Sequence, residues 1–270
     1  MAIAMAVSPG SRRALDMLRW SADGTLSPGT RQQTACPNTA GERMAEPHLN
    51  QPGGLHRSST HPRIAGRELE LRSMADAIRR LIALTVDSDA GTATTASAAA
   101  RLHALADELA PMVREVHPPK HSGIANDGDE SNPHDHFQFD VMLGIYNPLA
   151  LPVEMTWEPP VARGRATFTS PYEGPPNCVH GAVIAGAFDQ VFNVANLKTG
   201  VAGPTAYLHV DYRRPTMLLR PLLFEGWVDH TEGRKSYCKG RIIQDDVVTC
   251  EAEGLFIQVD PERIRNLGGV

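Results

Sequence analysis

One stretch of the sequence constrains the fold more than any other, an almost wholly apolar helix that the spacing predicts between Gly181 and Leu197. Its apolar residues leave little of the circumference polar; they are Val183, Ile184, Ala187, Phe188, Val191, Phe192, Val194 and Ala195. Such a helix is stable in water only when other elements cover most of its sides. A membrane span is not expected, because Asp189, Gln190 and two asparagines interrupt the apolar run. The rest of the fold should therefore enclose this helix.

Segments with the two-residue alternation of β-strands surround the helix in the sequence. Two precede it within residues 142–170, with a turn near residues 159–164. Four follow it, at residues 204–215, 222–230, 234–243 and 247–259. In the first of these four, one face carries Ala206, Leu208, Val210 and Tyr212, and the other carries Tyr207, His209 and Asp211. Short connections between the later strands predict antiparallel pairing. We expect an α+β fold over residues 136–262, with an antiparallel sheet wrapped around one long central helix.

The first half of the chain has a different character. Residues 1–60 are rich in Pro, Gly, Ser, Thr and Asn, which predicts a mostly disordered extension, and Met44 could equally begin a protein. Residues 61–118 contain two amphipathic segments, at 64–86 and 93–116, which predict a helical hairpin packed on a neighbouring element. Residues 119–135 are polar and predict a linker to the sheet domain.

Composition excludes several classes of function. The net charge is −5 and no basic block occurs, which argues against nucleic acid or a membrane surface as a partner. Four cysteines without metal-ligand spacing do not make a disulfide framework, so we expect a reducing, cytoplasmic location. The start of the chain does not read as a secretory signal, because its apolar run precedes its first basic residues. Walker A, dinucleotide-binding and GxSxG patterns are all missing from the sequence, so we expect no cofactor.

The start of the central helix is the first candidate for chemistry. A turn delivers the chain to His180, Gly181 and Ala182. The first N–H groups of a helix have no internal partners and lie at the positive end of its dipole. A glycine there lets a carbonyl oxygen approach the backbone, as an oxyanion hole requires. An ordinary helix start explains this feature equally well.

Asp189 is the second candidate, because it lies within the apolar run of the same helix. A carboxylate in such a place is costly unless it is paired or its burial serves a reaction. Both a structural carboxylate bonded to nearby backbone and a catalytic group fit this pattern.

Together these residues resemble a known family. The pattern His180-Gly181, seven residues, then Asp189 at the head of a long apolar helix resembles the hotdog-fold acyl-CoA thioesterases of the phenylacetate-degradation (PaaI-like) type. The order of the later features is also similar: Thr205, then a Y-x-x-P at residues 212–215, then Gly-Arg-Lys at residues 233–235. The resemblance covers residues 140–260 and departs from the family at Ala182, where a second glycine is common.

The resemblance implies an enzyme of lipid metabolism that hydrolyses acyl-CoA to a free acid and CoA without a cofactor. The N–H of Gly181, helped by that of Ala182, would polarise the thioester carbonyl. Asp189 would activate water or attack as a nucleophile, Thr205 would orient the water or the carboxylate, and His180 would shape the loop. Because CoA carries phosphates, basic residues at strand ends are the candidates for binding it: Arg213, Arg214, Arg234 and Lys235.

Helix geometry adds an argument that does not depend on the family. Gly181 and Asp189 are eight residues apart on one helix, which separates them by about 12 Å. They cannot both reach one thioester carbon. Catalysis by this pair therefore predicts a homodimer, or a dimer of dimers, with the active site at the subunit interface.

Two alternatives remain open at this point. A hotdog-fold hydratase would act on enoyl thioesters, although those enzymes carry a different arrangement of acids and histidines. A non-catalytic acyl-CoA-binding or scaffold protein would use the same fold and the helical hairpin for partners.

Overall fold

A computed structural model describes residues 63–113, 133–135, 137–197, 199 and 203–259. The helices are α2 (Glu68–Asp87), α3 (Thr92–Leu109) and α4 (Gly181–Asn196), with short 3-10 helices at Ala110–Met112, Pro133–Asp135 and Ser170–Tyr172. The strands are β1 (Val153–Glu158), β2 (Val161–Ala166), β3 (Thr205–Tyr212), β4 (Leu222–Glu232), β5 (Lys235–Gln244) and β6 (Val247–Ile257). None of the helices in these ranges has the length and hydropathy to span a bilayer.

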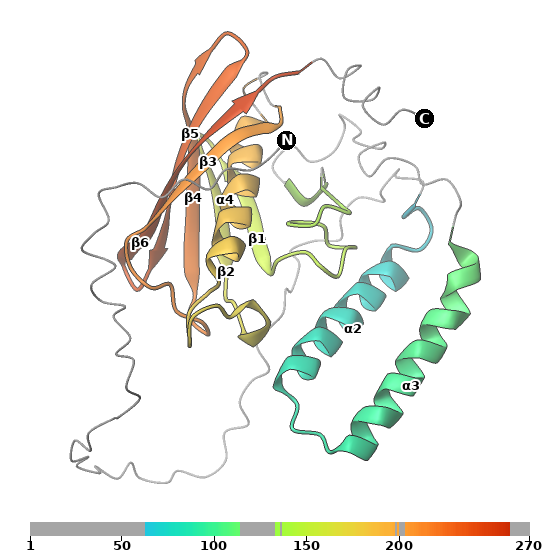
Figure 1. Cartoon of the computed structure of the whole chain (residues 1–270). Coiled ribbons are helices and arrows are strands. Elements are labelled where there is room, and N and C mark those ends of the chain that lie inside the picture. The colour runs from blue at the N-terminus through green and yellow to red at the C-terminus, as the bar shows by residue number, and fades with distance from the viewer. Residues whose placement is uncertain (1–62, 114–132, 136, 198, 200–202, 260–270) are drawn as a thin grey trace, which may run out of the picture.

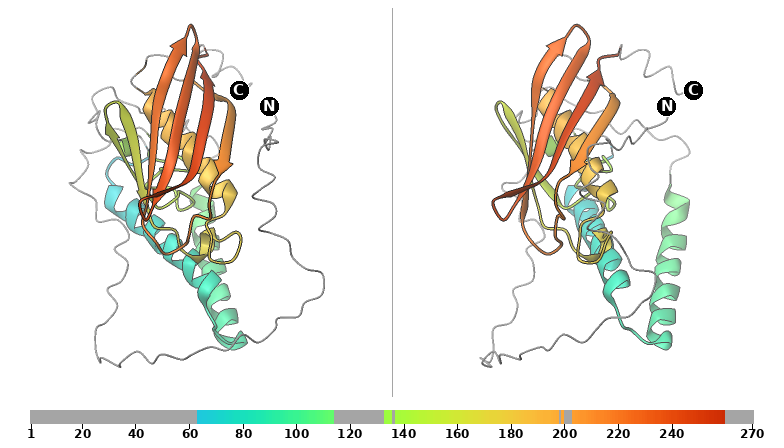
Figure 2. Two further views of the ribbon diagram at one scale, coloured as in Figure 1. Left: turned by 90° about the vertical axis from the view of Figure 1, so that its left-hand side faces the viewer. Right: turned by 60° about the vertical axis from the view of Figure 1, so that its left-hand side comes forward.

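The strands form one antiparallel sheet of six strands in the order β1-β2-β4-β5-β6-β3. Helix α4 lies against one face of this sheet (Figure 1, Figure 2). The prediction of an α+β fold with an antiparallel sheet wrapped around one central helix is confirmed.

Three glycines let α4 approach the sheet closely. Gly226 on β4 pairs directly with Gly240 on β5, and Gly254 lies on the next strand, β6. A Cβ atom on Gly226 would lie 2.5 Å from Val191, and one on Gly240 would lie 2.7 Å from Phe192. The ring of Phe192 is completely buried against these three glycines. Larger residues at these positions would push the helix away from the sheet.

One side of α4 is less covered than the sequence predicts. The buried positions face the sheet and the segment that leads into β1, whereas Ala182 is exposed and Gly186, Asp189 and Asn193 are only partly buried. These four residues recur at intervals of three or four, so they form a single stripe along the helix. The stripe carries small or polar side chains, which explains why a helix that is apolar elsewhere tolerates its exposure.

The two edges of the sheet differ in how they end. At the β1 edge, the N–H of Met155 donates to Nε2 of His134, 3.1 Å away, in the 3-10 helix Pro133–Asp135. The end of the segment predicted as a linker is therefore a docked part of the sheet domain. At the β3 edge, the structure shows pairing with β6 on one side and no described strand on the other. An eight-residue strand with one open side is a template for pairing with another chain.

Helix α2 is docked on the sheet domain by an arginine. The guanidinium of Arg79 donates to the carbonyls of Gly144, Ile145 and Asn147 at 3.1, 3.1 and 2.8 Å. Helix α2 also contacts the 3-10 helix Ser170–Tyr172. The sequence prediction that both N-terminal helices pack on a neighbour is therefore met by α2.

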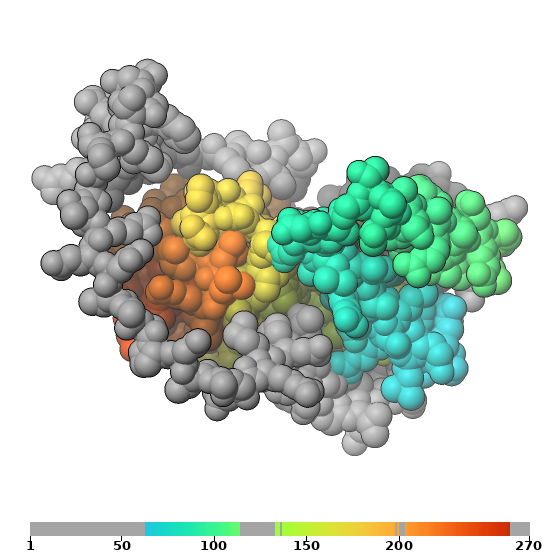
Figure 3. All heavy atoms as spheres, turned by 90° about the horizontal axis from the view of Figure 1, so that it is seen from below, coloured from blue at the N-terminus to red at the C-terminus, as the bar shows by residue number. Residues whose placement is uncertain are grey.

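Helix α3 does not meet that prediction. It contains no buried residue, and it protrudes with α2 beside the segment that leads into α4 (Figure 3). Its apolar positions Leu102, Leu105 and Leu109 are 39–50% exposed. The predicted extension, residues 1–60, and most of the predicted linker lie outside the described residues.

Candidate active site

The carboxylate of Asp189 is held from two sides. The hydroxyl of Thr205 donates to its Oδ1 at 2.5 Å. The side-chain amide of Asn193, one turn further along α4, donates to the Asp189 carbonyl at 3.0 Å and lies 3.5 Å from Oδ2. These contacts fix the orientation of a carboxylate on the partly open stripe of α4.

The surroundings of Asp189 make it more basic than an ordinary aspartate. Burial raises the pKa of the Asp189 carboxyl, the hydrogen bond from Thr205 lowers it, and the charge of Asp140 raises it. The net shift of the pKa is upward, because the loss of solvation outweighs the single hydrogen bond. A carboxylate of this kind accepts a proton more readily, as a general base must.

A β-bulge aims Thr205 at the helix. Simple alternation along β3 places Thr205 with Tyr207 and His209, on the face away from α4. The register shifts between Thr205 and Tyr207, where Thr205 pairs with Phe256 and Tyr207 with the adjacent Leu255. One extra residue in β3 breaks the alternation, which turns Thr205 toward Asp189.

The start of α4 presents one unpaired donor. His180 is the N-cap residue, and its Nδ1 accepts the N–H of Ala182 at 3.0 Å. The N–H of Gly181 has no acceptor among the described residues. The two backbone donors expected at Gly181 and Ala182 are therefore reduced to Gly181 in this structure, since the N–H of Ala182 is already engaged by His180.

Tyr212 has a role that the sequence analysis did not assign. Its hydroxyl donates to the carbonyl of Gly181 at 2.8 Å, which ties the end of β3 to the first turn of α4. A Cβ atom on Gly181 would lie 3.3 Å from that hydroxyl, so Gly181 is closely packed against it. The alternation in the sequence places Tyr212 on the same face of β3 as Leu208 and Val210, and this was the signal that could have identified it.

The two halves of the candidate site lie apart within one chain. Gly181 opens α4, and Asp189 follows eight residues later on the same helix, a separation of about 12 Å. Tyr212 accompanies Gly181 and Thr205 accompanies Asp189, so each half is built where one end of β3 meets α4. A single chain holds a base at one place and a carbonyl-binding N–H at another.

The four basic residues expected to bind CoA do not gather in one chain. Arg213 follows Tyr212, which pairs with Cys250, whereas Lys235 pairs with Ile257 near the other end of β6. Seven residues of β6 separate these positions, or about 23 Å. Their side chains also differ in availability: Arg213 is paired with Asp211 and Glu251, Lys235 lies 3.9 Å from Glu232, and Arg234 donates to the carbonyl of Gln258 at 3.4 Å. The guanidinium of Arg214 has no partner among the described residues.

Among the described residues, no group of three His, Cys, Asp or Glu side chains is placed to hold a metal ion. The chemistry available at the candidate site is that of a carboxylate, a hydroxyl and a backbone N–H.

An antiparallel sheet around one helix that carries these groups defines a hotdog-fold protein with a site suited to acyl transfer. A family model described as the Thioesterase superfamily matches residues 177–251, which include Gly181, Asp189 and Thr205. The crystal structure of a thioesterase superfamily protein is 34% identical, with a TM-score of 0.61 over 69% of this chain and 90% of that one. This chain belongs to the thioesterase superfamily, which confirms the resemblance found in the sequence.

Curated relatives carry a more specific name. Acyl-coenzyme A thioesterase THEM4 from Bos taurus is 34% identical over 96 residues, which cover 34% of this chain and 39% of that protein. The protein of the same name from Xenopus laevis is 35% identical over 94 residues, which cover 34% of this chain and 42% of that protein. The chain thus spans about two fifths of the length of these relatives.

Proposed function

We propose that this protein hydrolyses acyl-CoA thioesters to a free acid and CoA. The observation that carries this proposal is the half-buried Asp189, whose Oδ1 accepts the hydroxyl of Thr205 and whose pKa is raised. The name shared by the curated relatives supports the choice of acyl-CoA as the substrate. Three free cysteines among the described residues suit a reducing compartment such as the cytoplasm, where this activity would serve lipid metabolism.

Each active site combines residues of two subunits in this proposal. The open edge of β3 adjoins α4, since Thr205 and Tyr212 bond to Asp189 and Gly181 of that helix, and in this proposal a second copy covers both the edge and the small-residue stripe. When two α4 helices pack antiparallel about a two-fold axis near Ala185, Asp189 of one chain lies opposite Gly181 of the partner subunit. The same axis brings Arg213 and Arg214 to the end of the joined sheet that holds Arg234 and Lys235 of the partner subunit.

The reaction then proceeds by attack of water on the thioester. Asp189 takes a proton from water as the water oxygen bonds to the carbonyl carbon, and Thr205 keeps the carboxylate oriented. The N–H of Gly181 of the partner subunit donates to the developing oxyanion. Collapse of the tetrahedral intermediate breaks the C–S bond, and the proton held by Asp189 passes to the sulfur of CoA.

Release of free thiol from acyl-CoA substrates of graded chain length tests the proposal. We expect turnover in the wild type and a loss of kcat of about 10²–10⁴-fold in Asp189→Asn, which keeps the shape but cannot take a proton. Asp245→Asn is the matched control, because Asp245 is exposed and bonds only to Arg220 in the described part of the chain. Wild-type turnover in Asp189→Asn would contradict the mechanism. Formation of an enoyl product without release of thiol would show that the protein is a hydratase and not a thioesterase.

A further inference from the structure

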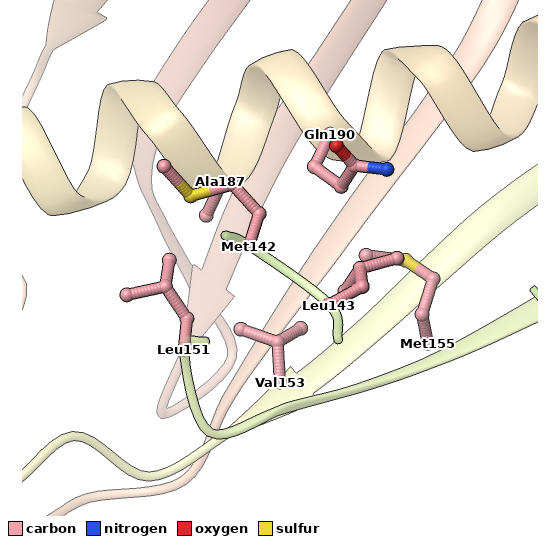
Figure 4. Close-up of a pocket in the computed structure, with 7 residues that line it drawn as sticks. All are labelled: Met142, Leu143, Leu151, Val153, Met155, Ala187 and Gln190. Carbon is pink, nitrogen blue, oxygen red and sulfur yellow. The ribbon is translucent and has the colours of Figure 1, made fainter. Parts of the chain in front are cut away.

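A gap with an apolar lining lies between α4 and the segment that leads into β1. Its lining comprises Met142, Leu143, Leu151, Val153, Met155, Ala187 and Gln190 (Figure 4). Six of these seven residues are apolar. The side chains close the gap so far that a water-sized sphere does not fit, so any occupant must displace one of them.

Gln190 is the polar exception in this lining. Gln190 lines the gap from α4 together with Leu143 and Met155 (Figure 4), and the residue is only 5% exposed. Its Nε2 has no hydrogen-bond partner among the described residues. Buried amide groups are normally paired, because an unpaired buried donor loses its hydration without compensation. An unpaired buried donor is available to an acceptor that a bound molecule brings.

The gap begins beside the candidate active site. The carboxylate of Asp140 accepts the N–H groups of Met142 and Leu143 at 2.7 and 3.1 Å, which shapes the loop over the gap. Asp140 is near enough to Asp189 for its charge to act on that carboxyl. The tip of Met142 lies over Gly186, one turn before Asp189, where an added Cβ would be 2.8 Å from it. Met142 therefore covers the part of the gap beside Gly186, on the turn of α4 before Asp189.

We infer that the acyl group of the substrate enters this gap as Met142 swings aside, and that Gln190 selects acyl groups that carry a neutral oxygen, such as a hydroxyl. This inference rests on the proposed function and names its substrate class. Methionine is suited to such movement, because its unbranched side chain adapts easily to a new shape. The apolar lining disfavours a charged acyl group, because a buried charge there would have no partner. The Nε2 donor favours an oxygen over a plain methylene at the same place.

Binding of non-hydrolysable thioether analogues of CoA tests this selection without requiring turnover. One analogue carries a straight alkyl chain, and the others have the same length with a hydroxyl moved along the chain one carbon at a time. We expect the wild-type protein to bind one hydroxyl isomer roughly tenfold more tightly than the alkyl analogue, as one added hydrogen bond provides. In Gln190→Met, which has a similar shape and no amide, that ratio should fall to about one.

Gln244→Met is the matched control. Gln244 is also buried, but its amide is fully used, accepting the N–H of Met217 at 2.7 Å and donating to the carbonyl of Met217 at 3.0 Å. We expect Gln244→Met to lower the Tm and keep the preference for the hydroxyl isomer. Gln190→Met should not lower the Tm, because its amide has no partner to lose.

The outcomes separate this inference from the proposed function. Binding of all analogues with no preference, or a preference that survives in Gln190→Met, would overturn the selection by Gln190. A drop in Tm in Gln190→Met as large as that in Gln244→Met would make the amide structural and overturn it too. Failure of the wild type to bind any analogue would contradict the proposed function itself.

Discussion

Asp189 shows how a few neighbours set the character of one residue. Burial raises its pKa, and Thr205 opposes that rise with one short hydrogen bond. The sequence alone identifies Asp189 as a candidate catalytic residue, because a carboxylate within an apolar helix is unusual. It could not supply the contact from Asn193 or the unpaired amide of Gln190, because both depend on how the helix is turned against its neighbours.

Replacing Thr205 should change the pH dependence of hydrolysis. The hydroxyl of Thr205 lowers the pKa of Asp189, so its removal in Thr205→Ala raises that pKa further. Because the base must be ionised, the acid limb of kcat/KM should move to higher pH, with kcat reduced by roughly tenfold. Thr205→Ser retains a hydroxyl and should keep the wild-type limb. An unshifted limb in Thr205→Ala, measured over the same pH range, would remove Thr205 from this role.

At the scale of elements, regular patterns were predictable and local irregularities were not. The apolar run predicted a helix ending at Leu197, and α4 ends at Asn196. The bulge in β3 was missed, since nothing in the alternation marks the extra residue near Ala206. The packing of Phe192 against three glycines was also missed. The sequence does contain a signal for it, because each of three successive strands carries one interior glycine, at residues 226, 240 and 254.

The docking of α2 offers an element-scale prediction. In Arg79→Ala, α2 loses the hydrogen bonds to three carbonyls of the sheet domain. We expect faster hydrogen exchange throughout α2, with the exchange of β4 and β5 unchanged. Arg80→Ala is the control, because Arg80 is exposed and its side chain makes no hydrogen bond or ion pair with the described residues. Equal exchange in the two variants would show that Arg79 does not hold α2.

For the whole molecule, the sequence predicts a site shared between two subunits, which stays a prediction. Helix rise alone separates Gly181 from Asp189, and the structure adds an open sheet edge and a small-residue stripe that could receive a second copy. Arg213 and Arg214 lie at one end of the sheet, and Arg234 and Lys235 lie at the other. This separation was not predictable, because it depends on the strand order.

Mixing two inactive variants tests the shared site. One carries Asp189→Asn, and the other carries Gly181→Leu, which blocks approach to the N–H. After subunit exchange, each heterodimer should contain one site with both lesions and one with neither. We expect activity up to about half of the wild-type rate in each heterodimer. Activity that stays near zero, although native mass spectrometry shows exchange, would place each site within one chain.

The open edge of β3 has a consequence for handling and for evolution. Thr205–Tyr212 contain no lysine or proline, so the features that limit pairing of this edge with another strand are the bulge near Ala206 and the charge of Asp211. A copy without a partner would present the regular part of this edge, after the bulge, to any extended chain that it meets. In the proposed dimer this edge is covered by the second copy, so dilution that separates the copies should favour aggregation over a stable monomer. If the proposed dimer forms, selection would act to keep the copies paired, whether or not substrate is present.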